Sequence, residues 1–175
     1  MVAPDRIETP RLILRAPCLD DADAIFAEYA QDPIVSKYLV WKPHRQVPET
    51  RAFLQRCKEE RLAGRSFAFV VLKKNNDHPI GMVEIGSDGC LGYVLGQAYW
   101  GQGLMTEAVK AVVAWASAQD SISKIWATCD VGNPASARVM EKAGLKFEKA
   151  LPKHSHHPNV SSELRDALKY SIIKK

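Results

Sequence analysis

A glycine-rich turn between an apolar strand and an amphipathic helix constrains this chain more than any other segment. Residues 90–95 (CLGYVL) have the length and apolar character of a strand, and the turn at 99–103 (YWGQG) follows them. Beyond it, apolar side chains recur on one helical face, at Leu104, Ala108, Ala111, Val112, Trp115 and Ala116. This order directs several unpaired backbone N–H groups and the positive end of a helix dipole at one place. The sequence therefore predicts an anion site here, of the kind that binds phosphate.

Two common phosphate-binding turns do not match this segment. A P-loop needs Gly-Lys-Ser/Thr at the start of its helix, whereas Gly103 is followed by Leu104 and Met105. The dinucleotide-binding fingerprint needs a third glycine where this chain has Thr106. Because glycine punctuates turns in every fold, the turn alone also leaves a purely structural role open.

The other apolar segments predict one mixed α/β domain over residues 1–175. Strands at 67–72, 79–85 and 90–95 are separated by short turns, so we expect antiparallel hairpins. A strand at 124–129 follows the helix that begins at 104, which is the pattern of a parallel pair. The remaining predicted elements are strands at 11–15, 145–148 and 168–173 and helices at 20–29, 48–63 and 133–143. The sheet would thus have about seven strands.

Composition narrows the class of protein. The 24 Lys and Arg against 20 Asp and Glu give a net charge of +4, and they are scattered, so we expect no nucleic-acid partner. The four cysteines form no Cys-x-x-Cys pair, which is typical of a reduced cytoplasmic protein. No apolar run approaches the roughly 20 residues of a membrane span, and the first nine residues lack the apolar core of a signal peptide. The sequence predicts a cytoplasmic protein without a membrane partner.

A second polar constellation follows the strand at 124–129. Asn133 is a good helix N-cap, Pro134 a good first helical residue, and Ser136 falls one turn into the helix. If the strands at 90–95 and 124–129 are parallel neighbours, both following helices begin at the same edge of the sheet. One ligand could then meet the glycine turn with its phosphates and Asn133 and Ser136 with its other end.

Together these segments resemble the GNAT superfamily of N-acetyltransferases, and within it the branch that acetylates the N-termini of ribosomal proteins. The likeness covers nearly the whole chain. The segments that carry it are Glu8–Arg15 (ETPRLILR), Ile80-Gly81, Gly92-Tyr93, Tyr99–Gly103, Thr106-Glu107-Ala108, Asn133-x-x-Ser136 and Glu141-Lys142-x-Gly144-x-x-Phe147. The resemblance implies a central, mostly antiparallel sheet that splays between its fourth and fifth strands, with helices on both faces. It also implies acetyl-CoA as co-substrate and no metal ion.

The resemblance further implies a set of cofactor-binding residues. Laid on this chain, the pyrophosphate signature of the family begins at Trp100 and ends at Met105, and both positions depart from the usual pattern. Binding would use the backbone N–H groups of Gln102, Gly103, Leu104, Met105 and Thr106. The strands ending at Leu95 and Cys129 would hold the pantetheine arm, with Val94 and Leu95 beside it and Asn133 hydrogen-bonded to it.

Catalytic roles are expected for two side chains. Ser136 occupies the position where related enzymes place a hydroxyl near the sulfur, so it would protonate or hydrogen-bond the leaving thiolate. Glu84, a carboxylate between apolar residues of a central strand, is our candidate base, although a solvent-facing strand residue remains the alternative. Tyr93 could supply a proton or could be a core tyrosine with a bonded hydroxyl.

Three further groups have weaker sequence signals. Tyr38, Trp41 and His44 lie in an irregular segment and could line the acceptor site. Three histidines, at 154, 156 and 157, lack a regular ligand set, so an ordinary polar loop at 152–162 is favoured over a metal site. Arg138 could meet the cofactor phosphates or remain a solvated charge.

The predicted reaction is transfer of acetyl from the thioester of acetyl-CoA to a primary amine by direct attack. The acceptor would be a protein N-terminus, a small amine or an amino acid. The alternative is a catalytically silent acyl-CoA-binding or protein-interaction module of the same fold. A homodimer is also expected to be possible, because the last predicted strand, 168–173, looks like an exposed edge.

Overall fold

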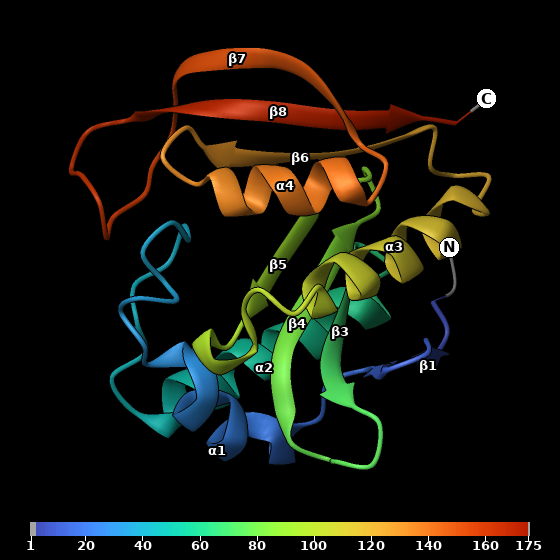
Figure 1. Cartoon of the computed structure of the whole chain (residues 1–175). Helices are drawn as coiled ribbons and strands as arrows, with labels where there is room; N and C mark the ends of the chain where they lie inside the picture. Colours follow the sequence, from blue (N-terminus) through green and yellow to red (C-terminus); the bar gives the residue numbers. More distant parts are fainter. Residues whose placement is uncertain (1–2, 175) are drawn as a thin grey trace.

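A computed structural model describes residues 3–174, which hold eight strands in two sheets (Figure 1). The larger sheet is antiparallel, and its strands neighbour one another in chain order: β1 (Arg6–Glu8), β2 (Leu12–Arg15), β3 (Ser66–Lys73), β4 (Pro79–Gly86) and β5 (Leu91–Leu95). The smaller sheet consists of β6 (Lys124–Asp130), β8 (Arg165–Ile173) and β7 (Lys146–Ser155), in that spatial order. The predicted mixed α/β fold is confirmed.

Helices cover both faces of the larger sheet. One face carries η1 (Leu19–Asp21), α1 (Ala22–Ile25), the π-helical turn η2 (Phe26–Ala30) and α2 (Val47–Leu62). The opposite face carries α3 (Leu104–Ser117), which follows the short turn η3 (Gln97–Tyr99), and α4 (Pro134–Lys142) packs beside α3 against the smaller sheet. None of the helices within residues 3–174 combines the length and apolar character of a membrane span.

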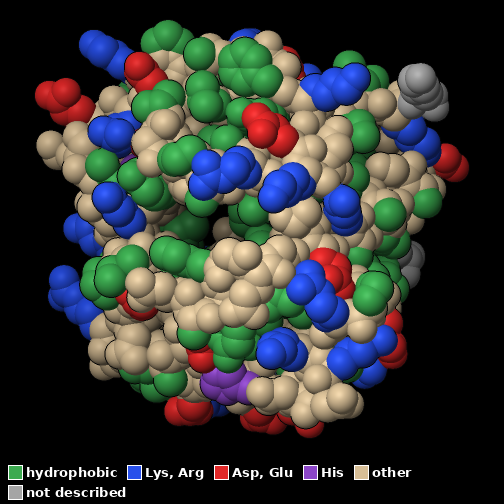
Figure 2. All heavy atoms as spheres, viewed as in Figure 1, with side chains coloured by type: hydrophobic (Ala, Val, Ile, Leu, Met, Phe, Trp, Pro, Cys, Tyr) green, Lys and Arg blue, Asp and Glu red, His purple; other side chains and the backbone are tan. Residues whose placement is uncertain are grey.

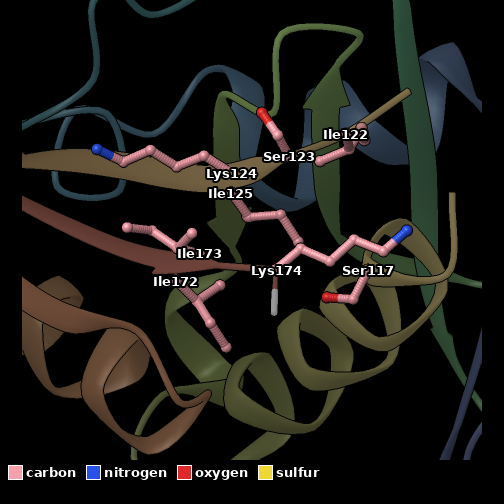
Figure 3. A pocket seen from close by; sticks show the side chains of 8 residues that line it. All are labelled: Ser117, Ile122, Ser123, Lys124, Ile125, Ile172, Ile173 and Lys174. Carbon is pink, nitrogen blue, oxygen red and sulfur yellow. The ribbon is translucent and has the colours of Figure 1, made fainter. Parts of the chain in front are cut away.

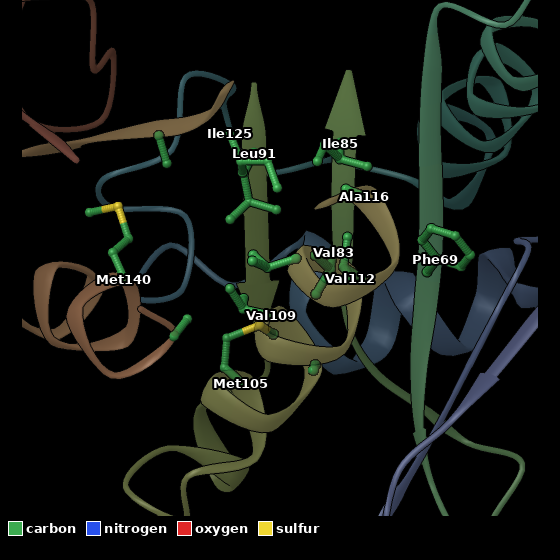
Figure 4. Packing of buried hydrophobic residues seen from close by; sticks show 14 of the residues in the cluster. Phe69, Val83, Ile85, Leu91, Met105, Val109, Val112, Ala116, Ile125 and Met140 are labelled. Atoms are coloured by element: carbon green, nitrogen blue, oxygen red, sulfur yellow. The ribbon is translucent and has the colours of Figure 1, made fainter. Parts of the chain in front are cut away.

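Two apolar cores follow from the alternation of side chains along the central strands. Phe69 and Val83 belong to the core that α3 completes with residues such as Val109 (Figure 4). Ala68 and Val70 face the other way, into the core formed with α1 and α2. Because β3 is buried on both faces, its sequence is an unbroken apolar run rather than an alternating one.

The two sheets meet at a single point and then diverge. Cys90 and Trp126 form a parallel bridge, in which the Trp126 N–H donates to the Gly89 carbonyl over 2.9 Å. Gly89 has a φ of +80°, and a Cβ there would lie 2.0 Å from the Lys124 carbonyl oxygen, so only glycine fits this approach. Within the described residues no ladder joins β5 to β6 beyond this bridge. The predicted splay between the fourth and fifth strands is confirmed, because these are β5 and β6.

Three features of the sheets differ from the sequence prediction. The charged strand β1 was not expected, because three residues carry too little pattern to detect. β7 runs to Ser155 and includes part of the predicted polar loop, and two register shifts in its pairing with β8 remove the regular alternation that marks a strand. β8 lies between β6 and β7, so the last strand is central and β7 is the edge. The argument for a homodimer through an exposed last strand was therefore wrong.

Candidate functional site

The open end of the gap between β5 and β6 presents a backbone donor. The Gly96 N–H donates to the Ile80 carbonyl over 2.8 Å, and Gly81 and Leu95 are opposed in the β4–β5 ladder. Since hydrogen-bonded pairs alternate along an antiparallel ladder, the Leu95 N–H points away from β4 and toward β6. The Leu95 carbonyl accepts a hydrogen bond from Trp100 Nε1 over 2.8 Å, which fixes the start of the glycine turn. Leu95 therefore offers a free N–H at the mouth of the gap.

The glycine turn leaves the first amides of α3 open. Gly101 and Gly103 have φ values of 74° and 72°, a conformation that favours glycine, and Gly103 is the N-cap of α3. Within the described residues no side chain caps this N-terminus, so the N–H groups of Leu104, Met105 and Thr106 lack helical partners. The Leu104 and Met105 side chains are buried, which anchors the start of α3. The five residues predicted to bind pyrophosphate thus follow one another across the end of the turn and the first turn of α3.

The two unusual positions of the signature have structural roles. The Trp100 indole binds the end of β5 instead of projecting into the anion site. The Met105 side chain is 5% exposed and belongs to the apolar core beneath α3. Neither departure removes a backbone donor from the turn.

Two hydroxyl groups meet across the gap from different elements. Tyr93 of β5 places its hydroxyl 2.7 Å from Ser136 Oγ of α4 and 2.9 Å from the Ser136 carbonyl oxygen. Asn133 caps α4, because its Oδ1 accepts a hydrogen bond from the Ser136 N–H over 3.2 Å, and its amide nitrogen remains a donor. Burial raises the pKa of Tyr93, and burial raises the pKa of the nearby Cys129 thiol to about 11. Both groups are therefore protonated at neutral pH.

This pair can deliver a proton to a third atom. Tyr93 and Ser136 carry one hydroxyl hydrogen each, and a single hydrogen bond between them uses only one. Either the remaining hydrogen goes to the Ser136 carbonyl or it is directed at an acceptor in the gap. An anion that forms within hydrogen-bonding reach would attract that hydrogen.

Glu84 lies on the other face of the sheet. It accepts a hydrogen bond from the Ser66 hydroxyl and is half-buried on the face that α2 covers, whereas Tyr93 packs into the α3 core. Glu84 is opposed to Gly92 in the ladder, and a Cβ at Gly92 would meet nothing within 4 Å. The structure therefore does not bring Glu84 and Ser136 together, but it leaves open space beside the carboxylate. The same alternation puts Val94 on the Glu84 face, and its backbone pairs with Met82.

Two loops border this end of the molecule. The loop at 34–46, between η2 and α2, is tied to the loop at 156–164, because Asn159 Nδ2 donates to the Ser36 and Trp41 carbonyls over 2.8 Å each. The Trp41 and His44 rings pack at a tilt of 37°, with their centroids 5.3 Å apart. Four exposed apolar side chains lie in these loops and just after β6: Ile34, Val40, Val131 and Leu164. The predicted acceptor segment is thus an ordered surface rather than a free loop.

A buried ionic cluster fixes the second loop to the end of β6. Asp130, 1% exposed, accepts hydrogen bonds from Arg165 over 2.5 and 3.0 Å and from the Gly132 N–H over 2.7 Å. The hydrogen bonds from Arg165 hold the pKa of this carboxyl below its usual range, against the effect of burial. His157 lies 3.9 Å from the same carboxylate. Within residues 3–174 no group of three or more His, Cys, Asp or Glu side chains could hold a metal ion.

The surface of the molecule is hollowed beside the gap between the two sheets. Figure 2 shows a hollow between the half of the molecule that carries α4 and the half that carries β5 and the glycine turn. Lys and Arg side chains surround this face, and Arg138 is exposed on α4. A basic surround suits an anionic ligand.

The comparison with known proteins decides the family. A family model described as an acetyltransferase (GNAT) domain matches residues 11–146. The chain belongs to the GNAT acetyltransferase family. The predicted family and the prediction of an N-acetyltransferase are confirmed.

Relatives of this acetyltransferase cover nearly its whole length. The uncharacterized N-acetyltransferase p20 of Bacillus licheniformis is 27% identical over 177 residues, which is 98% of this chain and 97% of p20. MccE, the microcin C7 self-immunity acetyltransferase solved with acetyl-CoA and AMP, has a TM-score of 0.86 at 20% identity and covers 98% of both chains. RimL, a ribosomal L7/L12 α-N-protein acetyltransferase solved with coenzyme A, has a TM-score of 0.85 at 20% identity, over 96% of this chain and 97% of RimL. These two structures share the fold.

Sequence reasoning did not assign a role to one contact network of the acetyltransferase. Glu107, in the first turns of α3, accepts hydrogen bonds from the Thr9 hydroxyl and from the backbone and side chain of Arg11. The three residues lie in segments that carried the family likeness, but a separation of 96 residues between Arg11 and Glu107 leaves no local signal. A second unexpected pair is Glu28 of η2 with His78, whose Nε2 lies 2.7 Å from the carboxylate.

A separate depression lies far from these groups. Figure 3 shows it between the C-terminal end of α3 and the ends of β6 and β8, lined mainly by Ile122, Ile125, Ile172 and Ile173. The glycine turn is at the other end of α3, about 20 Å away at 1.5 Å per residue. Its walls offer no acid, base or nucleophile beyond two serines and two lysines, so we assign it no chemistry.

Proposed function

We propose that this GNAT protein transfers the acetyl group of acetyl-CoA to a primary amine by direct attack. The observation that carries the proposal is the Tyr93–Ser136 hydroxyl pair, with its oxygens 2.7 Å apart, beside a gap whose mouth holds the uncapped end of α3. A proton donor and an anion site on one gap suit a long, phosphorylated thioester.

The donor would lie along the gap. The backbone N–H groups from Gln102 to Thr106 would bind the pyrophosphate, because an uncapped helix N-terminus attracts anions. The Asn133 amide nitrogen would donate to the pantetheine arm, since its oxygen is already used as the cap. The Leu95 N–H, directed into the gap, would stabilise the oxyanion of the tetrahedral intermediate.

Two proton transfers complete the reaction, one on each face of the sheet. An amine attacks only when it is neutral, so a base must take its proton; we assign this role to Glu84, which lies beside open space on the face covered by α2. Collapse of the intermediate releases a thiolate, and we assign its protonation to Ser136, supported by Tyr93. The amine nitrogen forms a bond to the carbonyl carbon while the bond from that carbon to sulfur breaks. The opposite placement of Glu84 and Ser136 suits an amine that approaches from one side and a thiolate that departs on the other.

A polypeptide N-terminus is the acceptor we propose. The two loops on the acceptor side and the residue after β6 expose four apolar side chains: Ile34, Val40, Val131 and Leu164. Such a rim suits contact with an extended chain more than with a small hydrophilic amine. MccE and RimL act on different partners by name, so the fold does not decide between them.

The test is release of coenzyme A thiol from acetyl-CoA in the presence of an amine panel. The panel would include short peptides with free N-termini, the same peptides with acetylated N-termini, and small amines. We expect turnover with free N-termini and none with blocked ones. Turnover with small amines alone would overturn the proposed acceptor.

Calorimetry, combined with the turnover assay, distinguishes an active acetyltransferase from a catalytically silent module. Binding of acetyl-CoA with no turnover on any amine would favour the acyl-CoA-binding alternative. If acetyl-CoA does not bind, both the acetyltransferase and the acyl-CoA-binding function are contradicted.

A further inference from the structure

The segment between β1 and β2 is fastened to the glycine turn. Arg11 Nε lies 2.6 Å from Glu107 Oε2, and the Arg11 backbone N–H donates to Glu107 Oε1 over 2.9 Å. The Thr9 hydroxyl donates to the same Oε1 over 2.6 Å. Arg11 Nη1 also donates to the Gln102 carbonyl over 2.9 Å. One guanidinium thus joins a carboxylate on α3 to the backbone of the turn that precedes α3.

The Gln102 contact orients the turn. The Gln102 carbonyl and the Gly103 N–H belong to one planar trans peptide unit. Because Arg11 holds the carbonyl, the Gly103 N–H is directed the opposite way. Gln102 lies between Gly101 and Gly103, which both have positive φ and little intrinsic preference for one conformation. The Arg11 guanidinium therefore restrains the backbone of residues 101–103, which the two glycines alone would leave flexible.

The Glu107 contact has an electrostatic consequence. Glu107 lies in the first turn of α3, so its negative charge is close to the helix N-terminus where an anion would bind. Its side chain is 17% exposed. Burial acts to raise the pKa of this carboxyl, but hydrogen bonds from Thr9 and Arg11 outweigh it and lower the pKa, so the group is ionised. Without a counter-charge this carboxylate would repel a phosphate. Arg11 supplies that charge, and its Nη2 lies only 3.6 Å from the position of a Cβ on Gly103.

We propose that Arg11 is a positioning residue of the diphosphate site, which orients the 102–106 amides and screens Glu107 from the phosphates of the donor. The inference rests on the proposed use of acetyl-CoA, because it concerns the same turn. The proposed role predicts different results for the single and the double charge variants, which a purely structural contact would not. Loss of Arg11 alone leaves the Glu107 charge exposed, whereas loss of both charges removes the repulsion.

The first experiment compares two acetyl donors in the thiol-release assay. Acetyl-CoA carries the phosphates, and S-acetylpantetheine lacks them. We expect Arg11→Ala to raise the KM for acetyl-CoA about tenfold with little change in kcat, because the variant loses the positive charge beside the phosphates and leaves the negative charge of Glu107 unscreened. The kcat/KM for S-acetylpantetheine should stay within about twofold. An equal fall with both donors would overturn the proposal.

The second experiment adds the compensating variant and needs no turnover. Calorimetry would measure the Kd of coenzyme A for wild type, Arg11→Ala, and Arg11→Ala combined with Glu107→Gln. We expect the double variant to bind more tightly than Arg11→Ala, and the deficit of Arg11→Ala to shrink in 0.5 M NaCl because salt screens the repulsion. A double variant that binds as weakly as the single one, at every salt concentration, would contradict the screening role.

Arg6→Ala provides the matched control. Arg6 forms an exposed ion pair with Glu8 over 2.9 Å in the same N-terminal region and does not contact the turn. Arg6→Ala should leave the KM for acetyl-CoA and the Kd of coenzyme A unchanged. Thermal denaturation of all variants identifies any general loss of folding, which would lower binding of both donors together. If wild type neither binds coenzyme A nor turns over acetyl-CoA, the proposed function fails; if wild type does both and Arg11→Ala equals it, only the role of Arg11 fails.

Discussion

The Tyr93 hydroxyl and Ser136 Oγ lie 2.7 Å apart although the first belongs to β5 and the second to α4. The two sheets diverge next to this contact, so the pair is held by elements from both halves of the molecule. This contact forms only when the two sheets are correctly spaced, so the proposed proton donor depends on that spacing.

The Tyr93–Ser136 pair should govern turnover more than donor affinity. We expect Ser136→Ala and Tyr93→Phe each to lower kcat by about 10²-fold, because general acid catalysis is typically worth that much or more. The double variant should lose little beyond the worse single variant, since the groups act as a unit. Steady-state thiol release measures these values. Tyr170→Phe, which removes a hydroxyl bonded to Glu141 over 3.2 Å, is the control and should retain normal kcat.

Glu84 should be needed for removal of the proton from the amine. Glu84→Gln should lower kcat/KM at neutral pH by about 10²-fold, because general base catalysis is typically worth that much or more. Ser66→Ala deletes only the hydroxyl that donates to Glu84 and should retain most of the activity. Steady-state thiol release measures both variants. A Glu84→Gln enzyme with the kcat/KM of wild type would exclude the carboxylate as base.

Glycine at position 103 should be needed for both stability and binding. The φ of 72° is strained for alanine by about 1 kcal/mol, and a shifted turn would misdirect the 102–106 amides. Gly103→Ala should therefore raise the Kd for coenzyme A. Gly64, at the end of α2, has a φ of 68° with open space for a Cβ, so Gly64→Ala should show a similar stability cost with normal binding. Urea denaturation and calorimetry together distinguish the two effects.

Acid should weaken the Asp130–Arg165 cluster. Hydrogen bonds from Arg165 lower the pKa of Asp130 in the folded chain, and therefore the folded state binds this proton less readily than the unfolded state. The contribution is complete above the unfolded pKa of about 3.9 and is lost as the pH falls through the lower folded value. Urea denaturation should show steady stability down to about pH 5 and a loss below about pH 4. Asp130→Asn should be less stable at pH 7 and should lose less on acidification.

Local patterns predicted most of the elements but not how distant segments meet. The glycine turn, the amphipathic face of α3 and the Asn133-Pro134 helix start have strong local signals, and each lies where expected. By contrast, Tyr93 and Ser136 are 43 residues apart, and their contact depends on the angle between the sheets. The same holds for Arg11 and Glu107.

The smaller sheet illustrates a second limit of sequence patterns. β7 is largely exposed, so its side chains need not alternate between apolar and polar. Its polar segment therefore resembled a loop. The central position of β8 could not be read from the chain order, because the last strand inserts between two earlier ones.

The bridge between Cys90 and Trp126 acts as a pivot, because the described backbone ladders join the two sheets only there. In any pair of arms joined at one end, a small change in angle at the joint becomes a larger change in opening at the far end. The contact of Gly89 with the Lys124 carbonyl lies at that joint. The aperture of the proposed thioester site is therefore set by residues at the closed end of the wedge, which need never touch a substrate.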